Sequence, residues 1–207
     1  MKEFLKRNQF LLINLAVAIF LGIGAVQERL KNWQAEGLDF VEAAFAIHNI
    51  ILLSVVLFRQ DQKAIETKIF PQIVALVAFC SGIALVRTPA VDASFPLAAK
   101  GVLFVGIFLG AATMLNLGKS FGILISLRTV KKKGFYGIIR HPMYFTDIIM
   151  RIGYVLKNGC TVNLVILFVS TTCYVYRAIL EERFLAQFQE YQEYMNEVKY
   201  RFIPGIF

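Results

Sequence analysis

Six long apolar runs most constrain what this chain can fold into. They cover Phe10–Val26, Leu38–Phe58, Ile69–Val86, Leu97–Leu115, Met143–Leu156 and Val162–Ile179. About twenty apolar residues in a helix are enough to cross the hydrocarbon layer of a bilayer. Hydrophobic residues make up 57% of the 207 residues, which is more than soluble domains usually carry. The sequence therefore predicts an all-α, polytopic membrane helix bundle of about six membrane segments.

Positive charges divide unevenly between alternate loops. The net charge of +8 would suggest nucleic-acid binding in a soluble protein, but here Lys and Arg stand between apolar runs and no nucleic-acid partner is predicted. Cytoplasmic loops accumulate Lys and Arg. One set of alternate loops, which includes both termini and residues 116–141, holds most of them, and the other holds only Arg29, Lys31, Arg87 and Lys157. We therefore expect both termini in the cytoplasm, and the compact size favours a bacterial inner membrane.

The last two runs are predicted to form a tight helical hairpin. Pro142 suits the first turn of a helix, because the N–H that it lacks has no helical partner there. Polar and flexible residues then interrupt the apolar sequence at Lys157, Asn158 and Gly159. Within the fifth run, Asp147 and Arg151 lie four residues apart and share a helix face, where an ion pair would reduce the cost of charge at membrane depth.

The segment after the hairpin is predicted to be an amphipathic cytoplasmic helix. Its apolar residues recur at spacings of three and four: Leu180, Phe184, Phe188, Tyr191, Met195 and Val198. If this helix is continuous, Glu181 lies at the edge of the apolar stripe and faces inward, whereas Glu182 points away. We accordingly divide the chain into N-terminal membrane helices, 1–115, and a C-terminal catalytic region, 116–207.

Two polar clusters stand out in this C-terminal region. Arg140 and His141 directly precede Pro142, where the chain enters the fifth run, and Glu181 and Glu182 follow the sixth. An antiparallel hairpin would bring both clusters to the same cytoplasmic rim. Surface ion pairs or contacts to lipid phosphates would be the structural alternative.

Ordered motifs across the same region carry a family resemblance. They are Leu117-Gly118-Lys119-Ser120-Phe121-Gly122, Gly134-Phe135-Tyr136, Arg140-His141-Pro142-Met143-Tyr144, Glu181-Glu182, and a tail with Tyr191, Tyr194 and Tyr200-Arg201-Phe202-Ile203-Pro204. With these motifs the sequence resembles the isoprenylcysteine carboxyl methyltransferase family, which belongs with the membrane phospholipid methyltransferases. The resemblance covers Leu117 to Phe207 and does not extend to the first hundred residues.

The resemblance implies a methyltransferase that uses S-adenosylmethionine on the cytoplasmic side. The catalytic residues would be Arg140, His141, Glu181 and Glu182. The cofactor would be bound by Tyr136, Arg140, His141, Pro142, Tyr144, Glu181, Glu182 and Tyr200. These residue types suit the cofactor, because an arginine can pair with its carboxylate, a glutamate with its ammonium or ribose hydroxyls, and an aromatic ring with its adenine.

The acceptor is expected to be lipid-borne or a small apolar molecule that enters from the membrane lipids. A carboxylate, phosphate, amine, phenol or thiol would each be compatible, and only a protonated acceptor would need a general base, for which His141 and Glu181 are candidates. The scattered cysteines Cys80, Cys160 and Cys173 form no zinc-binding pattern, so no metal is predicted. A Rossmann-type cofactor site is excluded, because no Gly-x-Gly-x-x-Gly segment follows a predicted strand.

Two alternatives stay open. Thr146 stands where the family commonly has a small residue, and Asp147 after it resembles the ending of a motif in membrane sterol reductases, which bind NADPH. A non-catalytic scaffold that retains the fold is the other alternative. His48 and the glycines Gly22, Gly24, Gly101, Gly106 and Gly110 are interpreted as sites of helix packing.

Overall fold

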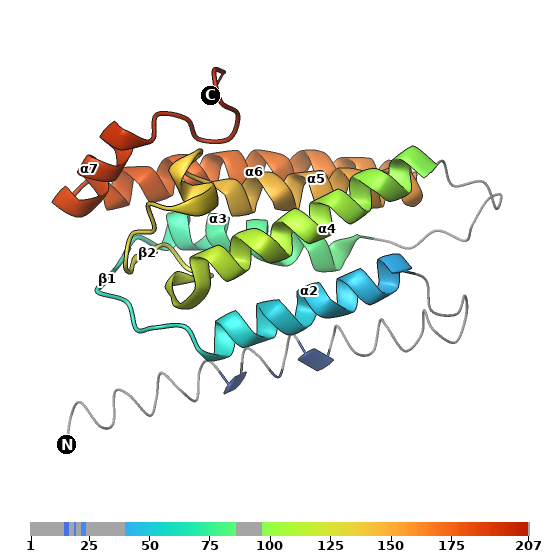
Figure 1. Cartoon of the computed structure of the whole chain (residues 1–207), viewed down its shortest axis with the longest axis horizontal. Coiled ribbons are helices and arrows are strands. Elements are labelled where there is room, and N and C mark those ends of the chain that lie inside the picture. Colours follow the sequence, from blue (N-terminus) through green and yellow to red (C-terminus); the bar gives the residue numbers. More distant parts are fainter. Residues whose placement is uncertain (1–14, 17–18, 20–21, 24–39, 86–96, 207) are drawn as a thin grey trace.

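The computed structural model describes residues 15–16, 19, 22–23, 40–85 and 97–206, and it is mostly helical (Figure 1). Its α-helices are α2 (Phe40–Leu57), α3 (Ile69–Cys80), α4 (Leu97–Leu117), α5 (Pro142–Lys157), α6 (Thr161–Leu185) and α7 (Gln189–Glu197). Short 3-10 turns are η1 (Ser81–Ala84), η2 (Gly118–Ser120) and η3 (Gly134–Gly137). Two short strands, β1 (Ala64–Ile65) and β2 (Ser126–Leu127), pair antiparallel. The prediction of a mainly helical chain is therefore confirmed.

Two helices within the described ranges are long and apolar enough to cross a membrane. They cover Ala98–Ser120, which combines α4 with η2, and Thr161–Leu185, which is α6. The apolar segments Ala43–Leu57 and Ile69–Cys80 are shorter. Large apolar side chains on α4 and α6 point outward, with Phe108 64% and Phe168 74% exposed, which suits a lipid environment. The bundle of six membrane segments stays a prediction, since the first run, 10–26, lies largely outside the described residues.

The third apolar run is less regular than predicted. Helix α3 ends at Cys80, and the chain tightens into η1 instead of continuing as an α-helix. At this point the Ser81 hydroxyl donates to the carbonyl of Ala78 at 2.8 Å, which is the kind of local side-chain bond that competes with helix continuation.

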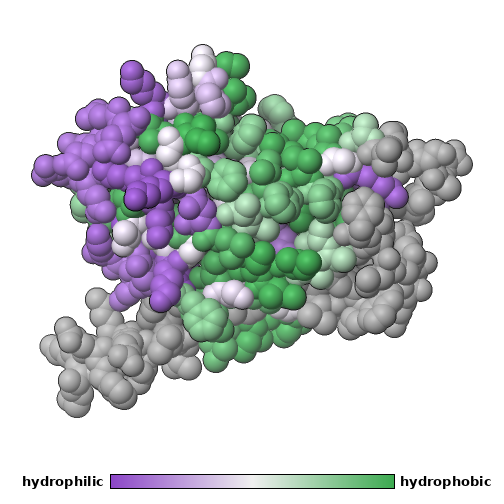
Figure 2. Space-filling view, in the orientation of Figure 1, coloured by the Kyte–Doolittle hydropathy of each residue, from purple (hydrophilic) through white to green (hydrophobic). Residues whose placement is uncertain are grey.

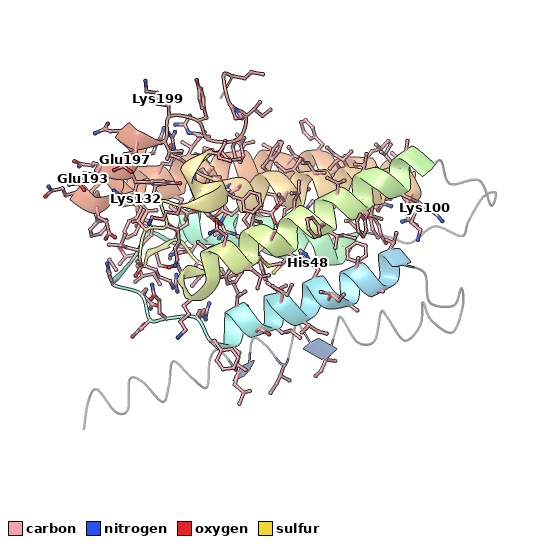
Figure 3. The ribbon with its side chains drawn as sticks, viewed as in Figure 1. His48, Lys100, Lys132, Glu193, Glu197 and Lys199 are labelled. Atoms are coloured by element: carbon pink, nitrogen blue, oxygen red, sulfur yellow. The ribbon has the colours of Figure 1, made fainter. Side chains whose placement is uncertain are left out.

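Hydrophilic residues gather at one end of the molecule. Figure 2 shows them over the end that carries β1, β2 and α7, whereas hydrophobic residues cover the middle of the helices. Lys132, Glu193, Glu197 and Lys199 lie at this polar end in Figure 3, and Lys100 lies at the opposite end. The apolar middle is thus bounded by charged side chains along the helix direction.

The hairpin of α5 and α6 agrees with its prediction. Helix α5 begins at Pro142 and ends at Lys157, and α6 begins at Thr161. The turn is closed by the Asn163 side chain, which donates to the carbonyl of Asn158 at 2.6 Å. An antiparallel hairpin follows, and it returns the end of α6 to the level at which α5 begins.

The predicted continuous tail helix is wrong. Helix α6 ends at Leu185, and Phe188 adopts an extended conformation before α7 begins at Gln189. The Gln192 side chain donates to the carbonyl of Ala186 at 2.7 Å, which satisfies a group that the break leaves free. The break lets α7 fold onto the loop that contains Ile125 and Leu127, so the apolar stripe is still buried in one cluster.

Close packing of α4 on α5 depends on two glycines. A Cβ added at Gly106 would lie 2.6 Å from the backbone nitrogen of Met150, and one at Gly153 would lie 2.5 Å from the Cα of Leu103. Both neighbours are backbone atoms and cannot rotate away. A Cβ added at Gly101, by contrast, would meet no atom of the described residues within 4 Å, so its predicted packing role is not seen among them.

Alanine at either close-packed glycine should therefore destabilise the protein. We expect Gly106→Ala and Gly153→Ala each to lower the free energy of unfolding by about 1–3 kcal/mol, because the helices must separate. Gly101→Ala is the matched control on α4 and should be neutral or slightly stabilising. Thermal unfolding in detergent measures the difference, and equal effects at Gly106 and Gly101 would contradict the packing described above.

Candidate functional site

Two motif glycines shape the loop that leaves α4. Gly118 and Gly134 have φ angles of 54° and 67°, in the left-handed region that side chains with a Cβ rarely adopt. Gly134 also lies against Asn116, whose side-chain oxygen accepts from the backbone N–H of Phe135 at 3.0 Å. Each of these two motifs therefore has glycine at the position where the backbone requires a positive φ angle.

A buried arginine anchors this loop to the helices. Arg177 of α6 donates from Nη2 to the carbonyl of Ile123 at 2.7 Å and from Nη1 to the carbonyl of Ala75 at 3.1 Å. Its guanidinium also lies 4.9 Å from the ring centroid of Tyr144, on α5. One side chain therefore connects α3, α5, α6 and the loop.

The C-terminal segment lies across the start of α5. The backbone N–H of Arg140 donates to the carbonyl of Tyr200 at 2.9 Å, and that of His141 donates to the carbonyl of Arg201 at 3.0 Å. Arg140 adds two bonds from Nη1, to the carbonyls of Val198 and Lys199, both at 2.8 Å. This strap, residues 198–202, fixes the backbone on either side of the Arg-His pair.

The carboxylate of Glu182 joins the strap, the Arg-His pair and α6. Its Oε1 accepts from Arg140 Nε at 2.7 Å and lies 3.1 Å from His141 Nε2, and its Oε2 accepts from Arg201 Nε at 2.8 Å. Glu182 is only 3% exposed and Glu181 is half-buried, so the prediction that Glu181 is the inward-facing member and Glu182 points away is wrong. The predicted meeting of the two polar clusters at one rim is confirmed by these contacts.

Glu181 faces a different environment from its neighbour. Its Oε2 accepts a hydrogen bond from the hydroxyl of Tyr144. The Tyr144 ring stacks on the His141 ring at a centroid distance of 5.2 Å and an angle of 12°. Glu181, Tyr144 and His141 therefore form one wall.

This wall belongs to a pocket that is partly open to solvent. The loop after α4 contributes Gly122, Ser126 and Arg128 to the pocket, and η3 contributes Tyr136. Arg140 lies on the pocket as well. Charged, aromatic and apolar groups thus meet in one cavity at the polar end of the bundle.

Comparison with known protein families identifies a match. Residues 96–192 match the model of the phospholipid methyltransferase family. Just under half of the chain is thus similar to this family. The family resemblance predicted from the motifs is confirmed, and the match fits an integral membrane methyltransferase. No curated protein matches the chain.

Five of the eight residues predicted to bind the cofactor line the pocket. They are Tyr136, Arg140, His141, Tyr144 and Glu181. Three do not: Pro142 begins α5, Glu182 lies behind Arg140 and His141, and Tyr200 is 38% exposed. Tyr200 contributes its carbonyl to Arg140 instead of its ring to the pocket.

Sequence reasoning missed Arg128 as a pocket residue and assigned no role to Tyr191 and Tyr194, which also line it. Both tyrosines belong to the tail motif, and the hydroxyl of Tyr194 donates to the carbonyl of Tyr136 at 2.7 Å. Burial raises the pKa of Tyr136, Tyr191 and Tyr194, so these phenols stay neutral hydrogen-bond donors at physiological pH. Arg128 stands in a basic run without a motif, which is why no sequence signal distinguished it.

Asp147 and Arg151 share a face of α5 but do not form a direct ion pair. The hydroxyl of Tyr174 donates to Asp147 Oδ2 at 2.6 Å and accepts from Arg151 Nη2 at 3.2 Å, so the tyrosine bridges the two charges. His48 Nδ1 lies 3.3 Å from the carbonyl of Ile107, on α4, in agreement with its predicted packing role. None of these four polar side chains lines the pocket.

Removal of the Glu182 charge should strongly destabilise the site. In Glu182→Gln, Arg140 and Arg201 lose their buried counter-charge, and breaking a buried ion pair typically costs about 3–5 kcal/mol. Glu193→Gln, an exposed change of the same type on α7, should alter stability by no more than about 0.5 kcal/mol. Denaturant unfolding measures the free energy of unfolding of both purified variants. Equal values would show that Glu182 does not hold the strap, the Arg-His pair and α6 together.

Proposed function

We propose that this protein transfers a methyl group from S-adenosylmethionine to a lipid-borne or small apolar acceptor. The observation that carries the proposal is that Glu181 and Arg140 line the same pocket, within a segment that matches the phospholipid methyltransferase family.

The residues present fit this cofactor. A guanidinium has five N–H donors. Arg140 uses Nε and Nη1 for Glu182 and the strap, and Nη2 has no hydrogen-bond partner among the described residues. Nη2 is therefore available for a carboxylate. Glu181 can accept from an ammonium or a ribose hydroxyl, while the rings of Tyr136 and Tyr191 offer surfaces for adenine.

Methyl transfer mainly requires that the acceptor atom, the methyl group and the sulfur be aligned. When bound, the cofactor supplies an electrophilic methyl group, and the carbon–sulfur bond breaks with its electron pair left on sulfur as the acceptor's lone pair forms the new bond. The strap and Glu182 hold Arg140 and His141 rigidly, which keeps the reacting partners in line. Because the Glu182 carboxylate can only accept, His141 Nε2 is the donor, and Nδ1 is left to take a proton from an acceptor that carries one.

We further propose that the pocket lies on the cytoplasmic side of a bacterial inner membrane, with both termini on that side. The polar end in Figures 2 and 3 supports this orientation, because it collects Lys132 and Lys199 with the loop that follows α4. Residues 116–207 would then hold the catalytic region, and the acceptor would enter from the lipid along helices of residues 1–115.

Cofactor binding is the direct test. Purified full-length protein should bind S-adenosylhomocysteine in titration calorimetry, and Glu181→Gln should weaken binding by about tenfold or more, because one charge-assisted hydrogen bond is lost. Glutamine can still accept from Tyr144, so the wall should remain folded.

Glu193→Gln serves as the matched control and should bind as the wild type does. The proposal would be rejected if the wild-type protein bound NADPH and not S-adenosylhomocysteine, since that is the behaviour of the reductase alternative. Unchanged affinity in Glu181→Gln would remove this residue from the cofactor site.

A further inference from the structure

Arg128 is a buried cation that none of the motifs explains. It directly follows β2, lines the pocket and is 7% exposed. A Cβ at Gly122 would overlap its Nη1, so this motif glycine leaves the space in which the guanidinium lies. The loop thus holds Arg128 in place at the pocket.

Hydrogen bonds fix the guanidinium without neutralising it. Nε donates to the carbonyl of Gln60 at 3.1 Å, Nη1 donates to the Ser126 hydroxyl, and Nη2 lies 3.5 Å from Gln62 Oε1. These neutral partners use three of its five N–H donors. No described carboxylate lies within 4 Å of it. Arg128 therefore has donors left for a ligand, and its charge has no direct counter-ion.

The surrounding charges act on Arg128 in both directions. Burial and the nearby charge of Arg59 lower its pKa to about 10, against the raising effect of Glu181 and Asp61, and the guanidinium is still protonated at neutral pH. Arg128, Lys131 and Arg140 line the pocket as cations, and Glu181 is its carboxylate. Arg140 already has Glu182 as its counter-ion, and Glu181 and Asp61 lie beyond ion-pair distance of Arg128, so the least closely paired positive charge lies at Arg128 and Lys131.

Bound S-adenosylmethionine would not pair this charge. It carries a sulfonium, an ammonium and a single carboxylate, and the proposed function pairs that carboxylate with Arg140. Arg128 still has N–H donors for a second anion, and an oxyanion bound there would pair its buried charge.

We propose that Arg128 binds an anionic oxyacid group, a phosphate or a carboxylate, on the methyl acceptor. This inference rests on the proposed function and narrows its acceptor class. The guanidinium fork matches the two oxygens of such a group, and its fixed position would orient the acceptor toward the cofactor side of the pocket.

Binding of defined probes to the full-length protein, saturated with S-adenosylhomocysteine, tests the inference. The probes are dihexanoyl phosphatidate, decanoate, inorganic phosphate and, as the neutral reference, dihexanoylglycerol. We expect phosphatidate or decanoate to bind at least about tenfold more tightly than dihexanoylglycerol, and Arg128→Gln to remove this preference. Phosphatidate that binds more tightly than inorganic phosphate supports a lipid-borne acceptor, and equal affinities support a soluble anion.

Two further variants separate binding from folding. Gln62→Glu places a carboxylate beside Nη2 and keeps the loop contacts, so it should weaken phosphatidate or decanoate binding about tenfold in a folded protein. Lys119→Gln removes an exposed positive charge that does not line the pocket and should change nothing.

The result that overturns the inference is equal binding of the anionic probes by wild type and both Arg128→Gln and Gln62→Glu, or no preference for anions in the wild type. Loss of S-adenosylhomocysteine binding by the wild type would instead overturn the proposed function.

Discussion

The carboxylate of Glu182 joins three segments that are distant in the sequence. It accepts from Arg140 and Arg201 and contacts His141, so the entrance of α5, the end of α6 and the strap meet on one side chain. Burial of Arg140 and His141 at this rim is stabilised because the anion Glu182 is buried with them. The pocket depends on this arrangement, since Arg140 and His141 reach it from a backbone that the strap holds.

Polar and charged side chains are also paired with one another along the α5–α6 hairpin. Tyr144 of α5 donates to Glu181 of α6, and Tyr174 of α6 donates to Asp147 of α5, so each helix supplies one phenol and one carboxylate. Arg177 and Arg151 lie against the rings of Tyr144 and Tyr174 respectively. Polar groups within apolar helices are thus bound to one another, which gives the hairpin a fixed register next to the pocket.

Several elements could be predicted because their causes are local. Pro142 fixes the start of α5, and the polar residues after Lys157 end it. The tail helix was predicted wrongly because an apolar stripe has the same spacing whether or not the helix breaks at 186–188. The break depends on the packing of Tyr191 and Val198 against Ile125 and Leu127, which are far away in the sequence. Arg128 was missed for the same reason, since only folding brings a basic loop onto the pocket.

The sequence by itself determined the apolar helices, the hairpin and the family, because these depend on composition, on periodicity and on motifs in a fixed order. Only the tertiary structure decided how two adjacent glutamates divide their roles. Neighbouring residues on a helix point about 100° apart, so Glu181 faces the pocket while Glu182 is buried behind it. The strap and the loop that pack around α6 determine that Glu182 contacts Arg140 and that Glu181 lines the pocket.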